Sequence, residues 1–194
     1  MMLTIKSRNG RKTVRSIEQC AKGGAFCKSA FRKKVLAMKV AIACEMSSFA
    51  LKEAVKQRLE AAGYEMIDVG QKTADEPMLY YDAAKNLAQA IQSGECEKGI
   101  VICGTGAGVS MIVNKFRGVY CVACESVFTA EKIGLINNAN VLAMGARVVS
   151  HDMGGEMAEK FLAGKWCEGF AEQRRLNNER GYAMLQAIEE ESFR

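Results

Sequence analysis

The chain has 194 residues, with 27 basic and 22 acidic side chains, eight cysteines and a single histidine. Its hydrophobic fraction of 49% and charged fraction of 25% are ordinary for a globular protein, and the length suits one domain with a sizeable core. The single histidine, His151, which we expect in a solvated loop, excludes any mechanism or metal site that needs two imidazoles. No apolar run reaches the roughly 18 residues that a membrane span requires, so we expect no membrane partner.

The net charge of +5 is unevenly distributed along the chain. Residues 1–37 hold ten of the basic residues and one acidic residue, which gives this segment +9 and leaves −4 for residues 38–194. We do not expect a nucleic-acid partner, and any such partner would have to bind residues 1–37. Three interpretations of this basic extension stay open: a disordered extension of unknown role, a targeting or nucleic-acid-binding arm, and an artefact of start-site assignment.

The even number of cysteines does not predict a disulfide framework, because a chain of this length with this much apolar sequence does not need one. No stretch resembles a secretory signal, so we expect reduced thiols in a cytoplasmic protein. Cys121 and Cys124 form one C-x-x-C motif within an apolar run. No second such motif exists in the chain, which favours two buried strand residues over a zinc or redox pair.

From residue 38 onward, short apolar runs alternate with segments of helical periodicity. In chain order, we expect a strand over 39–44, a helix over 49–62, a strand over 65–69, a helix over 81–91, a strand over 99–103, a helix over 109–116, a strand over 119–124, a helix over 128–135, a strand over 140–143, and helices over 153–162 and 172–188. This alternation predicts an α/β protein with a five-stranded parallel sheet between two layers of helices. Such folds bind ligands beyond the carboxyl ends of their strands.

One of these strand ends carries a distinctive loop. Three glycines, Gly104, Gly106 and Gly108, follow an apolar strand and precede a helix, which allows backbone N–H groups to approach an anion. Cys103 stands directly before them, where free N–H donors would favour its thiolate as a base or nucleophile. On the residues alone, a tight packing turn and an inert buried thiol remain the alternatives.

Five segments of the chain resemble ribose-5-phosphate isomerase B and its galactose-6-phosphate isomerase relatives: MKVAIAC (38–44), LKEAV (51–55), GYEMIDVG (63–70), GIVICGTGAGVSMIVNKFRGV (99–119) and NNANVLAMGARVV (137–149). The resemblance covers residues 38 to about 175, so we expect residues 38–194 to form a sugar-phosphate isomerase domain. It implies a Rossmann-like fold, a homodimer or homotetramer, and no metal or other cofactor. The implied reaction interconverts a phosphorylated aldose and ketose, of the ribose 5-phosphate type, through a cis-enediolate.

The same resemblance assigns roles to individual residues. Cys103 matches the catalytic base and Thr105 the hydroxyl that assists proton transfer. Residues matching those that hold the substrate or its enediolate are Glu45, Gly104, Gly106, Gly108, Ser110 and Asn137. Arg147 and Arg175 match phosphate-binding arginines, with ordinary surface charge as the alternative for both.

Three departures from the family pattern concern histidine and arginine positions. The usual Asp-His pair after the first strand is Glu45-Met46, and the histidine credited with ring opening is Ile136. The usual GGRH stretch reads GFAE over 169–172, so one phosphate-binding arginine and one histidine are missing. Ring opening needs an acid–base group that titrates near neutral pH, so these losses indicate a substrate that spends little time as a ring. The resulting alternatives are an isomerase of an open-chain tetrulose 4-phosphate and a non-catalytic sugar-phosphate-binding protein.

Overall fold

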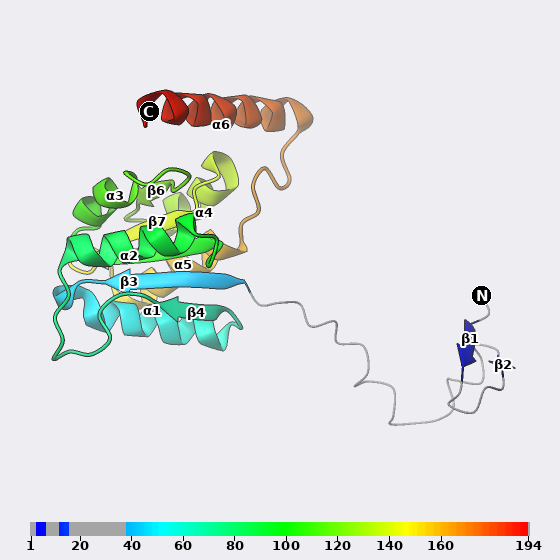
Figure 1. The fold of residues 1–194 in the computed structure, drawn as a ribbon, viewed down its shortest axis with the longest axis horizontal. Helices are drawn as coiled ribbons and strands as arrows, with labels where there is room; N and C mark the ends of the chain where they lie inside the picture. The colour runs from blue at the N-terminus through cyan, green and yellow to red at the C-terminus, as the bar shows by residue number, and fades with distance from the viewer. Residues whose placement is uncertain (1–2, 7–11, 16–37, 194) are drawn as a thin grey trace. The chain divides into compact units, whose positions relative to one another are not determined.

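The computed structural model describes residues 3–6, 12–15 and 38–193 (Figure 1), and the chain divides into two units, 1–36 and 37–194. In the first unit, β1 (Leu3–Lys6) and β2 (Lys12–Arg15) pair as an antiparallel hairpin. The role of the basic extension stays a prediction. The remaining elements all belong to the second unit.

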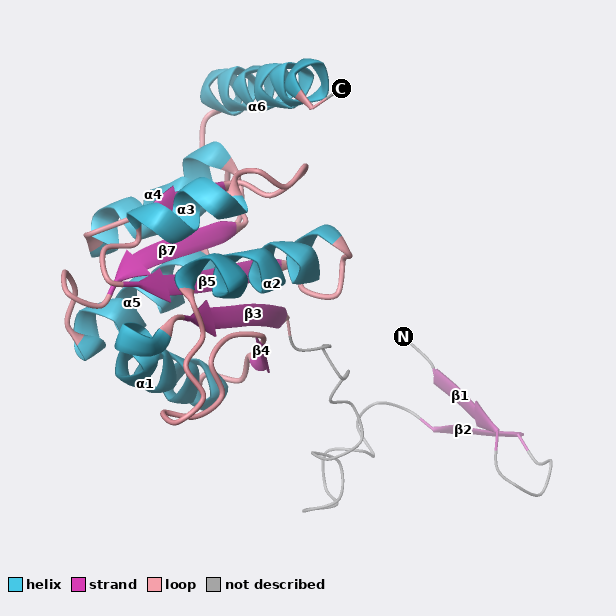
Figure 2. Cartoon of the chain, turned by 60° about the vertical axis from the view of Figure 1, so that its left-hand side comes forward, coloured by secondary structure: helices cyan, strands magenta, loops and turns pink. Residues whose placement is uncertain are grey.

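The second unit contains a five-stranded sheet in which every neighbouring pair is parallel. Its strands are β3 (Lys39–Cys44), β4 (Glu65–Asp68), β5 (Lys98–Cys103), β6 (Cys121–Ala123) and β7 (Val141–Gly145), arranged in the order β4-β3-β5-β7-β6. Figure 2 shows the arrowheads of β3, β5 and β7 at one edge of the sheet. This observation confirms the predicted α/β architecture and the predicted carboxyl edge.

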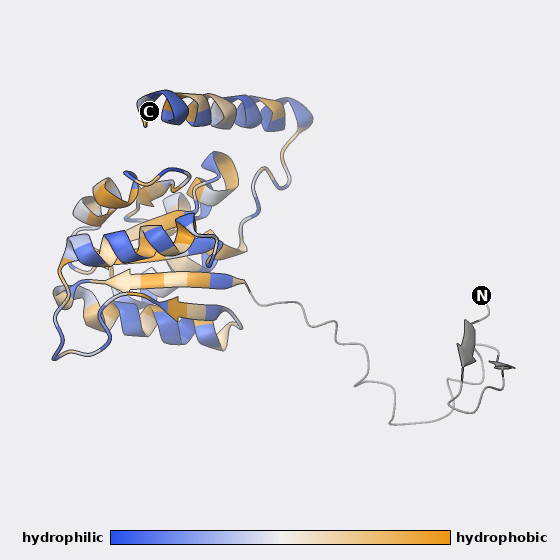
Figure 3. Cartoon of the chain, viewed as in Figure 1, coloured by the Kyte–Doolittle hydropathy of each residue, from blue (hydrophilic) through white to orange (hydrophobic). Residues whose placement is uncertain are grey.

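Helices cover both faces of the sheet, as the apolar strands require (Figure 1). The helices are η2 (Met46–Ser48), α1 (Phe49–Ala61), α2 (Tyr80–Gln92), α3 (Ala107–Val113), α4 (Val127–Asn137), α5 (His151–Ala163) and α6 (Glu172–Ser192). Even-numbered residues of β3 and β5 pack with α1, α4 and α5, whereas odd-numbered ones pack with α2 and α3. Figure 3 shows the resulting hydrophobic strands between helices with hydrophilic outer faces. By this alternation, Cys103 lies on the α2–α3 face.

The predicted elements all exist, but several boundaries differ. The strand predicted over 119–124 is only three residues long, and the helix predicted from residue 109 begins at Ala107. The placement of His151 in a loop was wrong, because it is the exposed first residue of α5. The hydroxyl of Ser150 accepts a hydrogen bond from the Met153 N–H at 3.2 Å, which starts this helix earlier than its apolar periodicity suggests.

Candidate active site

The loop after β5 places a thiol next to a backbone donor. Cys103 ends the strand and is 6% exposed, and its Sγ accepts a hydrogen bond from the Gly106 N–H at 3.2 Å. Gly106 has a φ of +80°, which L side chains rarely adopt. A Cβ there would also lie 3.0 Å from the carbonyl carbon of Met144. The loop therefore turns back on the thiol in a conformation that only glycine accommodates without strain.

The segment after β7 interlocks with this loop. The N–H groups of Ala146 and Arg147 donate to the carbonyls of Cys103 and Gly104, at 2.8 and 3.0 Å. A Cβ on Gly104 would lie 3.7 Å from Nε of Arg147, so the arginine side chain passes over the glycine. Arg147 is exposed and forms no salt bridge within residues 38–193. Two strand ends thus bring a thiol and an unpaired guanidinium to one place.

The start of α3 supplies donors and hydroxyls to the same loop. Thr105 is exposed, and its Oγ1 accepts a long hydrogen bond of 3.4 Å from the Ala107 N–H. The N–H groups of Gly108 and Val109 have no acceptor in the part of the chain that the structure describes. Ser110 is different, because its N–H donates to Gly106 and its hydroxyl donates to Ala107 within the helix. Its backbone therefore has no free donor for a substrate oxygen.

Glu45 lies at the neighbouring end of β3 and already accepts three hydrogen bonds. They come from the N–H of Ser47 at 2.9 Å and from the hydroxyls of Ser47 and Ser48 at 2.5 and 2.7 Å. Burial would raise the pKa of Glu45, but these hydrogen bonds and the nearby charge of Arg147 lower it below the ordinary value. The carboxylate is therefore ionised at neutral pH and caps η2, leaving little acceptor capacity for a substrate hydroxyl.

Tyr80 is a site neighbour that the sequence reasoning missed. It is the first residue of α2, the residue is 44% exposed, and a Cβ on Gly108 would lie 3.1 Å from its Cε2. The aromatic ring therefore rests against the glycine loop. The polar residues up to Pro77 indicate a loop at the end of a strand. Helical periodicity could not show that Tyr80, just after this loop, packs against α3.

Asn137 and Arg175 lie at the opposite edge of the sheet. Asn137 ends α4, three residues before Asn140, whose carbonyl accepts the N–H of Gly99 at 2.9 Å. Gly99 and Cys103 are four residues apart on β5, a span of about 13 Å. Within one chain, therefore, Asn137 does not reach the thiol.

The first turns of α6 occupy this same edge. Arg175 pairs with Glu179 at 2.5 Å, and one turn further on Asn178 contacts the Cys167 sulfur at 3.7 Å. The Cys167 N–H in turn donates to Leu135 near the end of α4. A cavity of about 270 Å³ lies between the two helices and is lined by Ile136, Asn137, Asn177, Asn178, Gly181, Tyr182 and Leu185. The predicted site residues thus form two groups at opposite edges.

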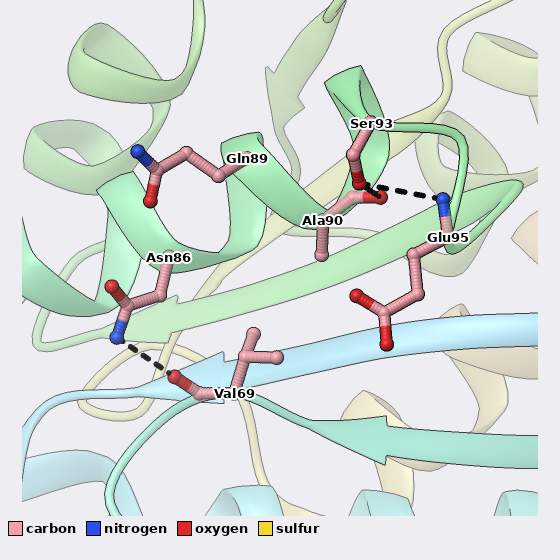
Figure 4. A pocket seen from close by; sticks show the side chains of 6 residues that line it. All are labelled: Val69, Asn86, Gln89, Ala90, Ser93 and Glu95. Atoms are coloured by element: carbon pink, nitrogen blue, oxygen red, sulfur yellow. Dashed lines mark hydrogen bonds between the residues drawn. The ribbon is translucent and has the colours of Figure 1, made fainter.

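A larger cavity of about 470 Å³ lies beside α2 (Figure 4). Two of its polar side chains are engaged by nearby backbone: Asn86 donates to the Val69 carbonyl at 3.1 Å, and the Ser93 hydroxyl donates to Ala90 at 3.2 Å. None of the residues predicted from the sequence lines it. The cavity therefore does not compete with the Cys103 loop as a reaction centre.

The remaining described cysteines are buried free thiols. Burial raises the pKa of Cys44 to about 12 and that of Cys124 to about 11, and it raises the pKa of Cys121 further. The C-x-x-C motif is thus a pair of inert core residues, as predicted. Among the described residues, no group of three or more metal-ligating side chains comes together, and no helix is both long and apolar enough to cross a membrane.

Residues 40–178 match the family described as Ribose/Galactose Isomerase. The 4-deoxy-4-sulfo-D-erythrose isomerase of Clostridium sp. (strain MSTE9) is 45% identical over 157 residues, which cover 81% of this chain and 99% of that protein. The D-erythrulose-4-phosphate isomerase of Pectobacterium atrosepticum is 32% identical, with 68% and 83% covered. The solved ribose-5-phosphate isomerase B of Clostridium thermocellum superposes with a TM-score of 0.72 at 32% identity, covering 80% and 99%.

Proposed function

Because this chain belongs to the ribose/galactose isomerase family, we propose that it interconverts an open-chain four-carbon aldose and ketose that carry an acidic group at C4. The proposal rests on the loop after β5, which carries the Cys103 thiol and the Thr105 hydroxyl and over which the Arg147 side chain passes. An aldose–ketose isomerisation needs a base, a proton carrier and donors for a developing oxyanion, and this loop has all three.

Each group has a defined task in the proposed reaction. The Cys103 thiolate removes the proton from the carbon next to the carbonyl, and the C–H electron pair forms the C1–C2 double bond of an enediolate. Backbone N–H groups of the glycine loop stabilise the negative oxygen. Thr105 carries a proton between the two oxygens, and the Cys103 thiol returns its proton to the other carbon. Atoms and charge balance without an oxidant or a metal.

The proposed substrate follows from the residues at the histidine positions. Ile136 and Met46 cannot act as the acid–base group that opens a sugar ring. A tetrose needs no such group when C4 carries a phosphate or a sulfonate, since no free C4 hydroxyl remains to close a furanose. The names of the two four-carbon sugar isomerases described above, which act on 4-deoxy-4-sulfo-D-erythrose and on D-erythrulose 4-phosphate, both describe such a substrate.

Between the two C4 groups, we favour the sulfonate. A sulfonate carries one negative charge, whereas a phosphate monoester carries about 1.5 to 2 at neutral pH. Glu172 stands in the stretch where the family pattern has a phosphate-binding arginine, and Arg175 is paired with Glu179. A binding site with fewer unpaired positive charges suits a monoanionic sulfonate better than a phosphate. The 45% identity to the 4-deoxy-4-sulfo-D-erythrose isomerase, over nearly all of that protein, supports the same choice.

We further propose that two copies complete the site. Asn137 and Arg175 are too far from Cys103 in their own chain, so a partner copy would bring them to it. Both regions expose apolar side chains that an interface would cover. They are Met184, Leu185 and Ile188 on α6, and Tyr80, Met111, Phe128 and Val148 around the carboxyl edge of the sheet.

A comparison of two cysteine variants separates an enzyme from a non-catalytic binder. Cys103→Ala is expected to abolish turnover of 4-deoxy-4-sulfo-D-erythrose while calorimetry still detects binding of that sugar. Cys124→Ala removes a thiol that is equally buried but lies outside the loop, and it is expected to retain activity. A wild-type protein that binds the sugar without converting it would contradict the proposal and indicate a sensor.

A further inference from the structure

A buried amide lies behind the candidate active site, in the segment between β4 and α2. Gln71 is 2% exposed, and both polar atoms of its side chain are hydrogen-bonded. Its Nε2 donates to the Thr73 carbonyl at 2.8 Å, and its Oε1 accepts the Met78 N–H at 3.2 Å. The amide therefore closes residues 71–78 into a loop whose two ends are tied together.

Gln71 is itself fixed from two sides through its backbone. Its N–H donates to the carbonyl of Cys44 at the end of β3, and its carbonyl accepts the Lys52 ammonium at 2.5 Å. Lys52 is fully buried in α1 and is neutralised by Asp68 at 2.5 Å. A buried ammonium is costly unless it is paired and hydrogen-bonded, so these contacts hold Gln71 firmly.

The position of Met78 connects this anchor to the reaction loop. Its N–H is held by Gln71, and its carbonyl accepts the Met46 N–H at 3.2 Å, directly after Glu45. Two residues later, Tyr80 begins α2 with its ring against Gly108. A displacement of Met78 would therefore move both Met46 and Tyr80 relative to the Cys103 loop.

We propose that Gln71 is a positioning residue of the active site, whose buried amide sets the place of Tyr80 against the glycine loop. This inference rests on the proposed isomerase function. Gln71 does not touch the reacting atoms and acts through Met78 and Tyr80. A misplacement of about 1 Å in an active site can cost about 100-fold in rate. Loss of the Gln71 amide should therefore lower the reaction rate by a measurable amount.

The test compares Gln71→Met, which has a similar volume but no hydrogen bonds, with Thr73→Ala in the same loop. No side-chain hydrogen bond of Thr73 exists in the described structure, so its variant is expected to retain kcat/KM within about twofold. Gln71→Met is expected to lower kcat/KM by at least about tenfold at a temperature where the variant is folded. Gln71→Glu retains an acceptor for Met78 and should lose less.

A double-mutant cycle distinguishes positioning from general destabilisation. If Gln71 acts through Tyr80, Gln71→Met should have little further effect on kcat/KM in a Tyr80→Ala protein, although it lowers Tm in both backgrounds. Multiplicative losses in kcat/KM, or a loss below about twofold for Gln71→Met alone, would overturn the proposal.

Hydrogen exchange gives a readout that does not depend on activity. Gln71→Met is expected to accelerate amide exchange in residues 78–81 and 104–110, whereas Thr73→Ala leaves both unchanged. Unchanged exchange in residues 104–110 of Gln71→Met would overturn the coupling to the reaction loop. A wild-type protein without isomerase activity would instead contradict the proposed function, so the two failures remain distinct.

Discussion

The sulfur of Cys103 accepts a hydrogen bond from the N–H of Gly106, three residues along the chain and 3.2 Å away. This hydrogen bond holds the sulfur against the glycine loop, where the proposed reaction needs a base. The bond exists because Gly106 adopts a positive φ and because the end of β7 supports the loop from behind. The chemistry proposed for the thiol therefore depends on the packing of neighbouring backbone.

Gly145 provides the first prediction, because it is the point where β7 supports the loop. A Cβ there would lie 2.7 Å from the carbonyl carbon of Thr105, and neither backbone can easily give way. Gly145→Ala is expected to destabilise the protein by about 1–3 kcal/mol and to lower kcat/KM by at least about tenfold. Steady-state kinetics and denaturant unfolding measure the two effects.

Gly164 serves as the matched control for that substitution. It caps α5 with a negative φ, and a Cβ would meet its neighbours only at 3.7 Å or more. Gly164→Ala should leave kcat/KM unchanged. Equal kinetics for the two alanine variants would show that the loop does not need the close approach of Gly145.

The buried pair of Lys52 and Asp68 provides the second prediction. Asp68→Asn leaves the fully buried ammonium without its main partner, and we expect a loss of about 3 kcal/mol in the free energy of unfolding. Glu65→Gln, on the same strand, breaks an exposed pair with Lys39 and should cost less than about 1 kcal/mol. Similar losses for the two variants would contradict the importance of burial.

The pH dependence of this pair has a defined sign. Burial would raise the pKa of Asp68, but the hydrogen bond and charge of Lys52 lower it below the ordinary 3.8. The carboxylate thus contributes its full stability above pH 3.8, and the contribution is lost as the pH falls through the lower pKa of the folded state. For Lys52, burial would lower the pKa, but Asp68 and Glu53 raise it above 10.5, so its contribution is lost only at still higher pH.

Urea unfolding at several pH values checks this sign. The stability difference between wild type and Asp68→Asn should be constant near neutral pH and should shrink below pH 3.8. A difference that shrinks as the pH rises from 5 to 8 would contradict the assignment.

The third prediction concerns the proposed sharing of the site between copies. Cys103→Ala and Arg175→Ala chains are each expected to be nearly inactive. Coexpressed with different tags, they should form mixed dimers with one intact site, giving about a quarter of wild-type activity in a random mixture. Purification through both tags and ultracentrifugation verify that mixed dimers have formed. If these dimers recover no isomerase activity, Arg175 does not act on the partner's thiol.

The fold was predictable from the sequence because its buried strands are short apolar runs and its helices have clear periodicity. Helix starts were less visible: the Ser150 cap, which brings His151 into α5, precedes the apolar pattern by several residues. The location of Cys103 at a strand end was also predictable, since the glycines follow it directly.

The sequence left open whether Arg175 acts on the Cys103 of its own chain or on that of a partner. Motif matching places residues in one site without saying which chain contributes them, and only the direction of α4 shows that Asn137 lies at the far edge. Tyr80 and Gln71 were missed for a related reason. Their contacts are formed between elements that are distant in sequence, and no local pattern encodes such contacts.

We propose that this isomerase acts on open-chain four-carbon sugars with an acidic C4 group. The most direct test is a measurement of kcat/KM for 4-deoxy-4-sulfo-D-erythrose, D-erythrulose 4-phosphate and ribose 5-phosphate with one preparation of wild-type protein. We predict that the sulfonate sugar is the best substrate, that the tetrulose phosphate is second, and that ribose 5-phosphate is at least about 100-fold poorer. A strong preference for ribose 5-phosphate would contradict the claim.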